Sequence, residues 1–318
     1  MDAVHQIARI RSGTRRYDSI SISDFEVGSA FLFVRDATEE RARLPVWRRI
    51  ENENPELCII VEEQNGENIC ISNRGAAPRS VSLRDEDALR SVLGSALVYI
   101  DISGLSHHVW APLLRVADRI HTPVRVVYVE PESYRPHPTP ASPTLFDLSS
   151  SFGGLAPLPG FARLSGPADS SRTILVAMLG FEGNRPGRIA VEIDPAPKVV
   201  PIVGVPGFRM EYPSFTITCN RSFLTEHRAF SEIRFARASC PFSAYEALCD
   251  IQKDYRDHYI YIAPVGTKPH SLGAVWFAIR NPETTEIMYD FPSRKAGRTN
   301  GIGLTHVYDF AAYPHGRP

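Results

Sequence analysis

The residues best suited to chemistry lie in a short turn, Gly266-Thr267-Lys268-Pro269-His270, between an apolar run and a helical pattern. Glycine lets a backbone approach an anion closely, and the Thr267 hydroxyl can cap the helix or bind a ligand. Lys268 supplies a point charge, and proline at the first helical position loses no hydrogen bond. We expect Gly266 to Lys268, together with His270, to contact a phosphate-bearing ligand. The alternative is a well-capped helix with a surface lysine.

A second turn, Gly180-Phe181-Glu182-Gly183-Asn184-Arg185, also follows an apolar run. Its two glycines, Gly180 and Gly183, bracket an acid, and an amide and a guanidinium come next. A carboxylate accepts hydrogen bonds from sugar hydroxyls, and a guanidinium binds phosphate. We therefore expect Glu182 and Arg185 to address the sugar and a second phosphate of a nucleotide. A purely structural loop is the alternative.

Acid, hydroxyl and imidazole groups gather after a third apolar run, at Asp101, Ser103, Ser106, His107 and His108. Catalytic triads use these residue types, but triads are recognised by geometry and not by spacing. Ser103 can simply cap the turn, and adjacent histidines at a helix start commonly face solvent. We expect Asp101 and Ser103 to contribute ligand contacts. The local spacing supplies no third metal ligand, so no metal site is predicted.

Two further segments are candidates for contact with the same ligand. Asn220 and Arg221 follow residues 215–219, which have the pattern of a strand. The basic, glycine-rich segment 294–303 follows the final predicted strand and could fold over a phosphate-bearing ligand or contact a nucleic-acid backbone. A solvated loop is the alternative for this last segment.

The elements that must position these turns alternate between strand and helix. Runs such as 124–129 are β-branched, which is typical of parallel strands buried on both faces. The alternation predicts an α/β fold of tandem Rossmann-like lobes with mostly parallel sheets, in which ligands bind at the carboxyl ends of strands. The units 98–129 and 259–289 share a strand–turn–helix–strand order. An internal duplication and the general likeness of such units both explain this.

Composition divides the chain into three parts. Residues 1–135 are predicted to form an N-terminal Rossmann-like domain, and residues 172–318 a C-terminal one. Residues 136–171 are rich in proline, glycine and serine and cannot sustain a helix or a central strand, so we expect an ordered connector there.

Charge and cysteine content exclude some classes of function. The 318 residues include 35 Lys and Arg against 36 Asp and Glu, a formal net charge of −1. This balance disfavours binding to extended nucleic acid or to a membrane surface. No apolar run is long enough for a transmembrane helix. The five cysteines form no C-x-x-C pair, which fits a reducing cytoplasm.

The element Gly266-Thr267-Lys268-Pro269 resembles the G-T-K motif of CRISPR-associated Rossmann-fold (CARF) domains. In that family the motif follows a core strand and contacts cyclic or linear oligonucleotide second messengers. The resemblance covers this motif and the alternation over about residues 172–292, and it implies Gly266, Thr267 and Lys268 as ligand contacts. Val265 and His270 depart from the residues that usually flank the motif. No effector motif of the HEPN, P-D-(D/E)-x-K or helix-turn-helix type is evident.

These features favour a cytoplasmic sensor or regulatory subunit that binds a nucleotide or small oligonucleotide, of the kind found in prokaryotic antiviral defence or stress systems. One alternative is a hydrolase-type enzyme acting on a nucleotide or phosphorylated metabolite, with Glu182 or Asp101 as general base and Lys268 stabilising charge. Another is a structural subunit of a larger complex. A protein partner or a homodimer is compatible with each, and no particular cofactor is indicated. Convergence of the turns at 180–185 and 266–270 would favour a binding site.

Overall fold

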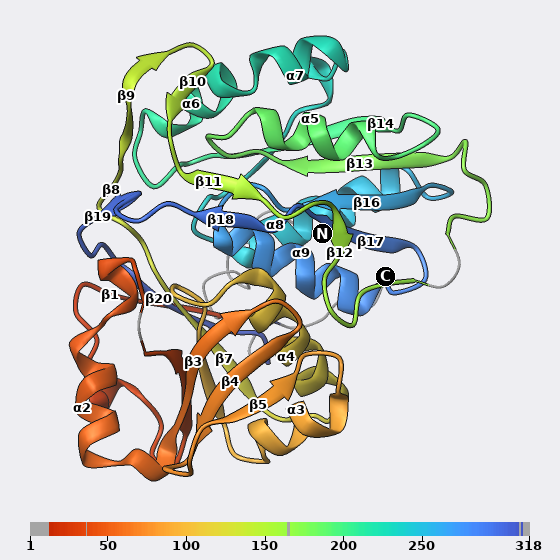
Figure 1. The fold of residues 1–318 in the computed structure, drawn as a ribbon. Helices are drawn as coiled ribbons and strands as arrows, with labels where there is room; N and C mark the ends of the chain where they lie inside the picture. Colours follow the sequence, from red (N-terminus) through yellow and green to blue (C-terminus); the bar gives the residue numbers. More distant parts are fainter. Residues whose placement is uncertain (1–12, 36, 164–165, 312, 314–318) are drawn as a thin grey trace. The chain divides into compact units, whose positions relative to one another are not determined.

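The structure, a computed structural model, describes residues 13–35, 37–163, 166–311 and 313 (Figure 1). The chain mixes helices and strands in an α/β fold and divides into two compact units. Unit 1 comprises residues 1–134 and 299–318, and unit 2 comprises residues 135–298. Among the described residues, none of the helices has the length and apolar character that a membrane crossing requires.

Unit 1 is built on an eight-stranded sheet. Its main elements in chain order are β1 (Thr14–Tyr17), β2 (Ala30–Val34), α2 (Pro45–Glu53), β3 (Cys58–Asn65), β4 (Asn68–Asn73), β5 (Arg79–Ser82), α3 (Glu86–Leu93), β6 (Val98–Asp101), α4 (His107–Arg119), β7 (Val124–Val129), β8 (Ser133–Tyr134), β19 (Thr299–Asn300) and β20 (Thr305–Asp309). The strand order is β1-β20-β7-β6-β2-β3-β4-β5, and the central strands β7, β6, β2 and β3 are parallel. Every residue of β2 is buried, as a parallel strand covered on both faces requires.

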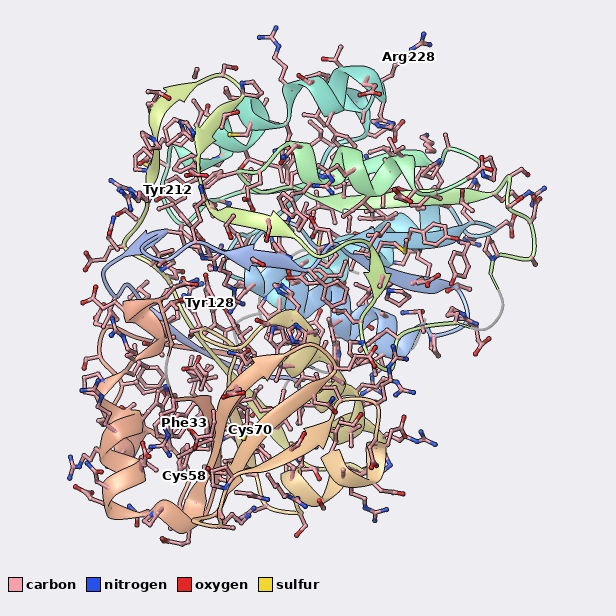
Figure 2. The ribbon with its side chains drawn as sticks, viewed as in Figure 1. Phe33, Cys58, Cys70, Tyr128, Tyr212 and Arg228 are labelled. Atoms are coloured by element: carbon pink, nitrogen blue, oxygen red, sulfur yellow. The ribbon has the colours of Figure 1, made fainter. Side chains whose placement is uncertain are left out.

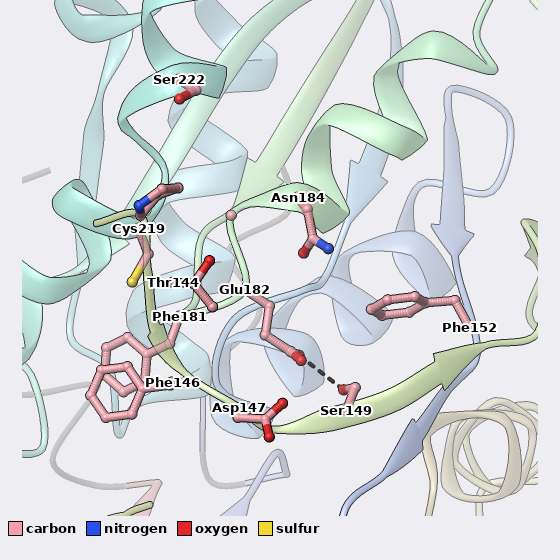
Figure 3. Close-up of a pocket in the computed structure, with 12 residues that line it drawn as sticks. Thr144, Phe146, Asp147, Ser149, Phe152, Phe181, Glu182, Asn184, Cys219 and Ser222 are labelled. Atoms are coloured by element: carbon pink, nitrogen blue, oxygen red, sulfur yellow. Dashed lines mark hydrogen bonds between the residues drawn. The ribbon is translucent and has the colours of Figure 1, made fainter. Parts of the chain in front are cut away.

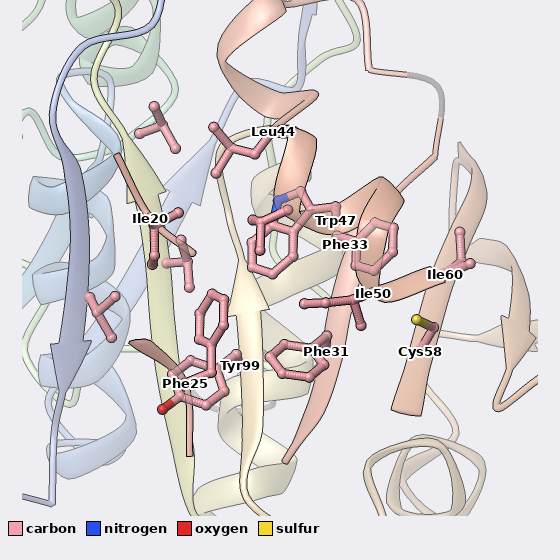
Figure 4. Close-up of a cluster of buried hydrophobic side chains, with 14 residues drawn as sticks. Ile20, Phe25, Phe31, Phe33, Leu44, Trp47, Ile50, Cys58, Ile60 and Tyr99 are labelled. Carbon is pink, nitrogen blue, oxygen red and sulfur yellow. The ribbon is translucent and has the colours of Figure 1, made fainter. Parts of the chain in front are cut away.

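Aromatic side chains pack α2 against this sheet. The ring of Trp47 stacks on Phe33 of β2, with centroids 5.5 Å apart and an interplanar angle of 9°. Figure 4 shows Phe25, Phe31 and Tyr99 completing the cluster. Each such aromatic pair contributes about 0.5–1.5 kcal/mol beyond the area it buries, so α2 is firmly held beside β2.

Unit 2 has a six-stranded sheet with helices and short strands around it. Its elements in chain order are β9 (Pro136–Ala141), β10 (Thr144–Phe146), β11 (Ser149–Phe152), β12 (Ala156–Pro157), β13 (Thr173–Met178), α5 (Asn184–Val191), β14 (Lys198–Gly204), α6 (Tyr212–Cys219), α7 (Arg221–Glu226), β15 (Arg234–Ala236), α8 (Pro241–Asp254), β16 (Tyr259–Ala263), α9 (Lys268–Arg280), β17 (Thr285–Tyr289) and β18 (Pro292–Arg294). The strand order is β12-β17-β16-β13-β14-β15, and all neighbours are parallel except β12 and β17. Separate apolar clusters cover the two faces of β13, whose six residues are all buried.

The order of the strands in unit 2 fixes where a crevice can form. From β13 the chain runs outward through β14 to β15, and then returns to β16 on the other side of β13. The connections at the carboxyl ends of β13 and β16 therefore leave in opposite directions. Ligands in open parallel sheets bind at such a switch point.

The boundaries of the units differ from those expected from composition. The segment 136–171 belongs to unit 2, where β9 pairs with β10, β11 with β18 and β12 with β17. Proline is compatible with these short strands because an edge strand leaves one row of amides without a sheet partner. The last strand, β20, lies between β1 and β7 and joins unit 1, a pairing across nearly the whole chain that has no local signal.

The strand expected at residues 215–219 is wrong, because this segment is the second half of helix α6. The two threonines of this segment donate their hydroxyl hydrogens to backbone carbonyls four residues earlier. Thr216 donates to Tyr212 at 3.0 Å and Thr218 to Ser214 at 2.9 Å. These bonds give the threonine hydroxyls partners within the helix itself.

Candidate functional site

The turns after β13 and β16 meet at the switch point of unit 2. A Cβ atom on Gly180 would lie 2.7 Å from the carbonyl oxygen of Val265, and one on Gly266 would lie 2.8 Å from that of Leu179. The two backbones are therefore in direct contact, and only glycine fits at either position. This is the convergence that the sequence led us to look for.

The end of helix α6 holds the turn after β13, residues 180–185, in place. Asn220 donates its side-chain amide hydrogens to the carbonyl oxygens of Gly180 at 2.7 Å and Thr216 at 2.8 Å. A Cβ atom on Gly183 would lie 1.8 Å from the carbonyl oxygen of Cys219, so this glycine too is required by a close backbone approach. Asn220 thus positions the turn after β13. Its contribution to a ligand site stays a prediction.

The turn after β16, residues 266–270, caps helix α9. The Thr267 hydroxyl accepts from the backbone N–H of His270 at 3.3 Å and donates to the carbonyl of Ala238 at 2.7 Å. His270 is fully buried with Nε2 3.1 Å from the carbonyl of Arg237, and burial lowers its pKa to about 4. The ring is therefore neutral at pH 7. Lys268 is buried at the first position of the helix, with 7% of its surface exposed. Ligand contact by this turn stays a prediction.

A pocket of about 310 Å³ opens beside the first turn (Figure 3). One wall comes from the end of β13 and the start of α5, and another comes from the segment that contains β10 and β11. The lining residues are Pro143, Thr144, Phe146, Asp147, Ser149, Phe152, Phe181, Glu182, Gly183, Asn184, Cys219 and Ser222. We call this the β13 pocket. It lies wholly within unit 2.

Two carboxylates provide the charge in the β13 pocket. Glu182 accepts hydrogen bonds from the Ser149 hydroxyl at 3.0 Å and from Nη1 of Arg185 at 3.2 Å, and 13% of its side chain is exposed. Asp147 pairs with Nζ of Lys295 at 2.5 Å. Among the lining residues neither lysine nor arginine occurs. The pocket therefore presents carboxylate acceptors that are each paired with a cation, and its lining offers no lysine or arginine to bind a phosphate.

Arg185, expected to contact phosphate, serves the structure of unit 2. Its Nε and Nη2 bind the two oxygens of Asp290 at 2.8 and 2.6 Å, and its Nη1 reaches Glu182. Burial works to lower the pKa of this guanidinium, but the hydrogen bonds and charge of Asp290 outweigh it and raise the pKa. Arg185 is thus a buried cation between two carboxylates, and it ties α5 to the end of β17.

Aromatic rings supply the apolar part of the β13 pocket. Phe146 and Phe181 stack with their centroids 4.2 Å apart and an interplanar angle of 14°. Phe152 lies across the pocket from them (Figure 3), with the guanidinium of Arg188 4.9 Å from its centroid. Rings beside carboxylates suit a flat group that carries hydroxyl or amine donors.

The sequence-based search missed the contribution of residues 143–152. Phe146, Asp147 and Ser149 lie in the segment that we expected to be a connector. The available signal was that its apolar residues, such as Phe146 and Leu148, need burial. Nothing in the local sequence shows that they are buried beside the turn after β13.

Asp101 and Ser103 lie in unit 1 and make structural contacts. The Asp101 carboxylate accepts from the indole N–H of Trp47 and from the backbone N–H of Ser103, both at 2.8 Å. The Ser103 hydroxyl accepts from the backbone N–H of Val129 at 2.9 Å. Both side chains are buried and connect β6 with β7 and α2. Their role as ligand contacts stays a prediction.

Within the described ranges, no group of three or more histidine, cysteine, aspartate or glutamate side chains is arranged to hold a metal ion. Comparisons with models of protein families, with curated proteins and with solved structures find no match to this chain. Its function is therefore inferred from the geometry and chemistry of the site alone.

Proposed function

We propose that the protein is a sensor or regulatory subunit that holds the nucleoside part of a small nucleotide-type ligand in the β13 pocket. The observation that carries this proposal is the pocket of about 310 Å³, with two carboxylates in its lining, beside the turn that follows the central strand β13. That volume is at the lower end of the range for small-molecule sites, which suits a group the size of a nucleoside.

The arrangement of unit 2 supports a Rossmann-like fold for this site. Strands β13 to β17 follow the order β15-β14-β13-β16-β17, with parallel neighbours throughout. In nucleotide-binding folds of this order an acidic residue commonly hydrogen-bonds the ribose hydroxyls. In our proposal Glu182 and Asp147 take that role, and the bases lie against Phe146, Phe181 or Phe152.

The resemblance of Gly266-Thr267-Lys268 to the CARF motif favours sensing as the purpose of binding. On this proposal the turn after β16 supports the crevice floor, and the ligand's remaining groups extend from the β13 pocket toward it. A protein partner or a second copy of the chain would pass the signal on. We propose a cytoplasmic location, because all five cysteines are free thiols, Cys58 and Cys70 among them (Figure 2).

A thermal-shift panel tests the proposal. Nucleosides, nucleoside monophosphates, dinucleotide cofactors and cyclic oligonucleotides are added to the wild type and to the variants Phe181→Ala and Lys268→Ala. We expect at least one nucleoside-containing compound to raise Tm for the wild type and not for Phe181→Ala. If none does, or if Phe181→Ala responds equally, the β13 pocket is not the ligand site.

Mass spectrometry of the same mixtures separates a sensor from an enzyme. The sensor proposal predicts an unchanged ligand after long incubation. Cys219, the thiol that lines the pocket, has a pKa raised by burial, so it is protonated at pH 7 and a poor nucleophile. A stoichiometric excess of product over protein would replace the sensor proposal with the hydrolase-type alternative.

A further inference from the structure

A second pocket, of about 320 Å³, lies in unit 1 at the carboxyl end of β2. It opens between the end of that strand, the segment just before α2 and one face of α2. The lining residues are Phe33, Val34, Arg35, Ala42, Arg43, Leu44, Trp47, Arg48, Glu51 and Asn52. We call it the β2 pocket. Like β13 in unit 2, β2 has parallel neighbours on both sides, β3 and β6, so this is again a position where ligands bind.

The charge of the β2 pocket is mainly positive. Three arginines and one glutamate line it. Arg35 is held by Glu51 at 2.5 Å and by Glu62 at 2.7 Å, so its guanidinium is fixed in place. Hydrogen bonding to Glu62 is the largest cause of its raised pKa, which keeps Arg35 charged.

Arg43 and Arg48 differ from Arg35 in having no carboxylate partner. Both are exposed, and neither has an ion pair or side-chain hydrogen bond within the described part of the chain. Other surface arginines near this helix are paired, such as Arg49 with Glu53 at 2.9 Å. Arg43 and Arg48 therefore combine an unpaired guanidinium, among the residues that the structure describes, with a place in the lining of the pocket.

The helix that carries Arg48 and Asn52 is packed against the sheet through Trp47. Trp47 is buried, its indole N–H is bound to Asp101 at 2.8 Å, and its ring stacks on Phe33. Arg48 and Asn52 are four residues apart on α2 and so lie on the same face of that helix. A ligand that reached the pocket would meet guanidinium donors from two segments and an amide donor from one of them.

We propose that the β2 pocket binds the terminal phosphate or diphosphate group of a small ligand. Arg43 and Arg48 would hold the phosphate oxygens, with Asn52 as a further donor and Arg35 as a fixed charge. Guanidinium groups bind phosphate through paired hydrogen bonds and, unlike a lysine, keep their geometry. The half-enclosed shape favours a terminal phosphate over a polymer backbone. This site does not depend on the ligand of unit 2.

Isothermal titration with inorganic pyrophosphate at low ionic strength tests this site. The wild type is compared with the double variant Arg43→Ala/Arg48→Ala and with Arg49→Ala, which removes a charge from the same helix outside the pocket. We expect pyrophosphate to bind the wild type and Arg49→Ala alike, within twofold. The double variant should bind at least tenfold more weakly. All three residues are exposed, so matching circular dichroism spectra are expected for the three proteins.

Two results would overturn the proposal. One is an equal loss of affinity in Arg49→Ala, which would show attraction to the general charge of the helix. The other is absence of binding to the wild type beyond that of sodium chloride at the same ionic strength.

A competition experiment with single-stranded oligonucleotides tests the ligand class. We expect a 5′-diphosphate nucleotide to displace pyrophosphate, and equal displacement by an oligonucleotide without terminal phosphates would contradict a small-ligand site.

Discussion

The two units place a pocket at corresponding points of their sheets, beyond the carboxyl end of a central parallel strand and beside the helix that follows it. The β13 pocket of unit 2 is lined by Glu182 and Asp147, whereas the β2 pocket of unit 1 is lined by three arginines. The parallel sheet therefore explains where each pocket lies. The side chains decide which ligand it can take.

The pockets also differ in how their charges are used. In unit 2 the nearby cations are paired: Arg185 is buried and shared between Asp290 and Glu182, and Lys295 is bound to Asp147. In unit 1 the cations Arg43 and Arg48 are exposed and unpaired among the described residues. The hydrogen bonds of a buried, paired cation already stabilise the fold, whereas an exposed, unpaired cation is free to bind a ligand. On our two proposals, unit 2 accepts hydrogen bonds from its ligand and unit 1 binds a phosphate.

The largest expected effect comes from removing the buried cation. Arg185→Met leaves two carboxylates without their partner, and we expect it to lower the free energy of unfolding of unit 2 by about 3–5 kcal/mol. Arg188→Met is the matched control, because Arg188 is exposed and its guanidinium contacts the same Phe152 ring. Hydrogen exchange of unit 2 peptides in increasing urea measures both. A cost below about 1 kcal/mol for Arg185→Met would mean that Arg185 is available to a ligand after all.

Acid should weaken unit 2 through His270. The pKa of this buried ring is lowered from an ordinary value of 6.5 to about 4, so the unfolded chain takes up a proton before the folded chain does. This contribution of His270 to the free energy of unfolding is present above pH 6.5. It is lost as the pH falls toward 4, by about 3 kcal/mol in all.

The free energy of unfolding of the wild type is compared with that of His270→Gln across this range. Glutamine can donate to the Arg237 carbonyl but does not titrate, so the variant should lack this part of the pH dependence. Parallel curves for the two proteins would show that the buried His270 does not cause the loss of stability in acid.

The close approach of Gly183 to α6 predicts a smaller loss. In Gly183→Ala the new methyl group would meet the backbone of Cys219, and we expect a cost of about 1–3 kcal/mol as the turn shifts. Gly187→Ala is the control on the same helix, where the nearest atom to an added Cβ is 3.8 Å away. Alanine there should stabilise by about 0.5–1 kcal/mol. Urea denaturation measures the free energy of unfolding of both variants. Equal changes in the two would show that close contact with Cys219 does not restrict residue 183.

The sequence predicts the turns of the site better than their surroundings. An apolar run followed by glycine and a helical pattern located the turns after β13 and β16, because strand ends and helix starts have local signals. Arg185 was also found, but its partner Asp290 lies 105 residues further along the chain. Without that partner its guanidinium suggested a phosphate contact.

The remaining features depend on contacts that are distant in sequence. Residues 143–152 form a wall of the β13 pocket only because β11 pairs with β18, more than 130 residues away. Arg43 and Arg48 are two arginines among many in the sequence, and only the fold distinguishes them from paired neighbours such as Arg49. Local periodicity carries neither kind of information.

The most direct test of the central claim is the effect of Glu182 on the choice between a nucleoside and its phosphate. Adenosine, guanosine, cytidine and uridine and their 5′-monophosphates are titrated calorimetrically into the wild type and into Glu182→Gln. We predict that at least one nucleoside binds the wild type no more weakly than its monophosphate does. Glu182→Gln should weaken that nucleoside about tenfold, the equivalent of one hydrogen bond to a charged group. Tighter binding of every monophosphate to the wild type, with no loss in Glu182→Gln, would contradict the account.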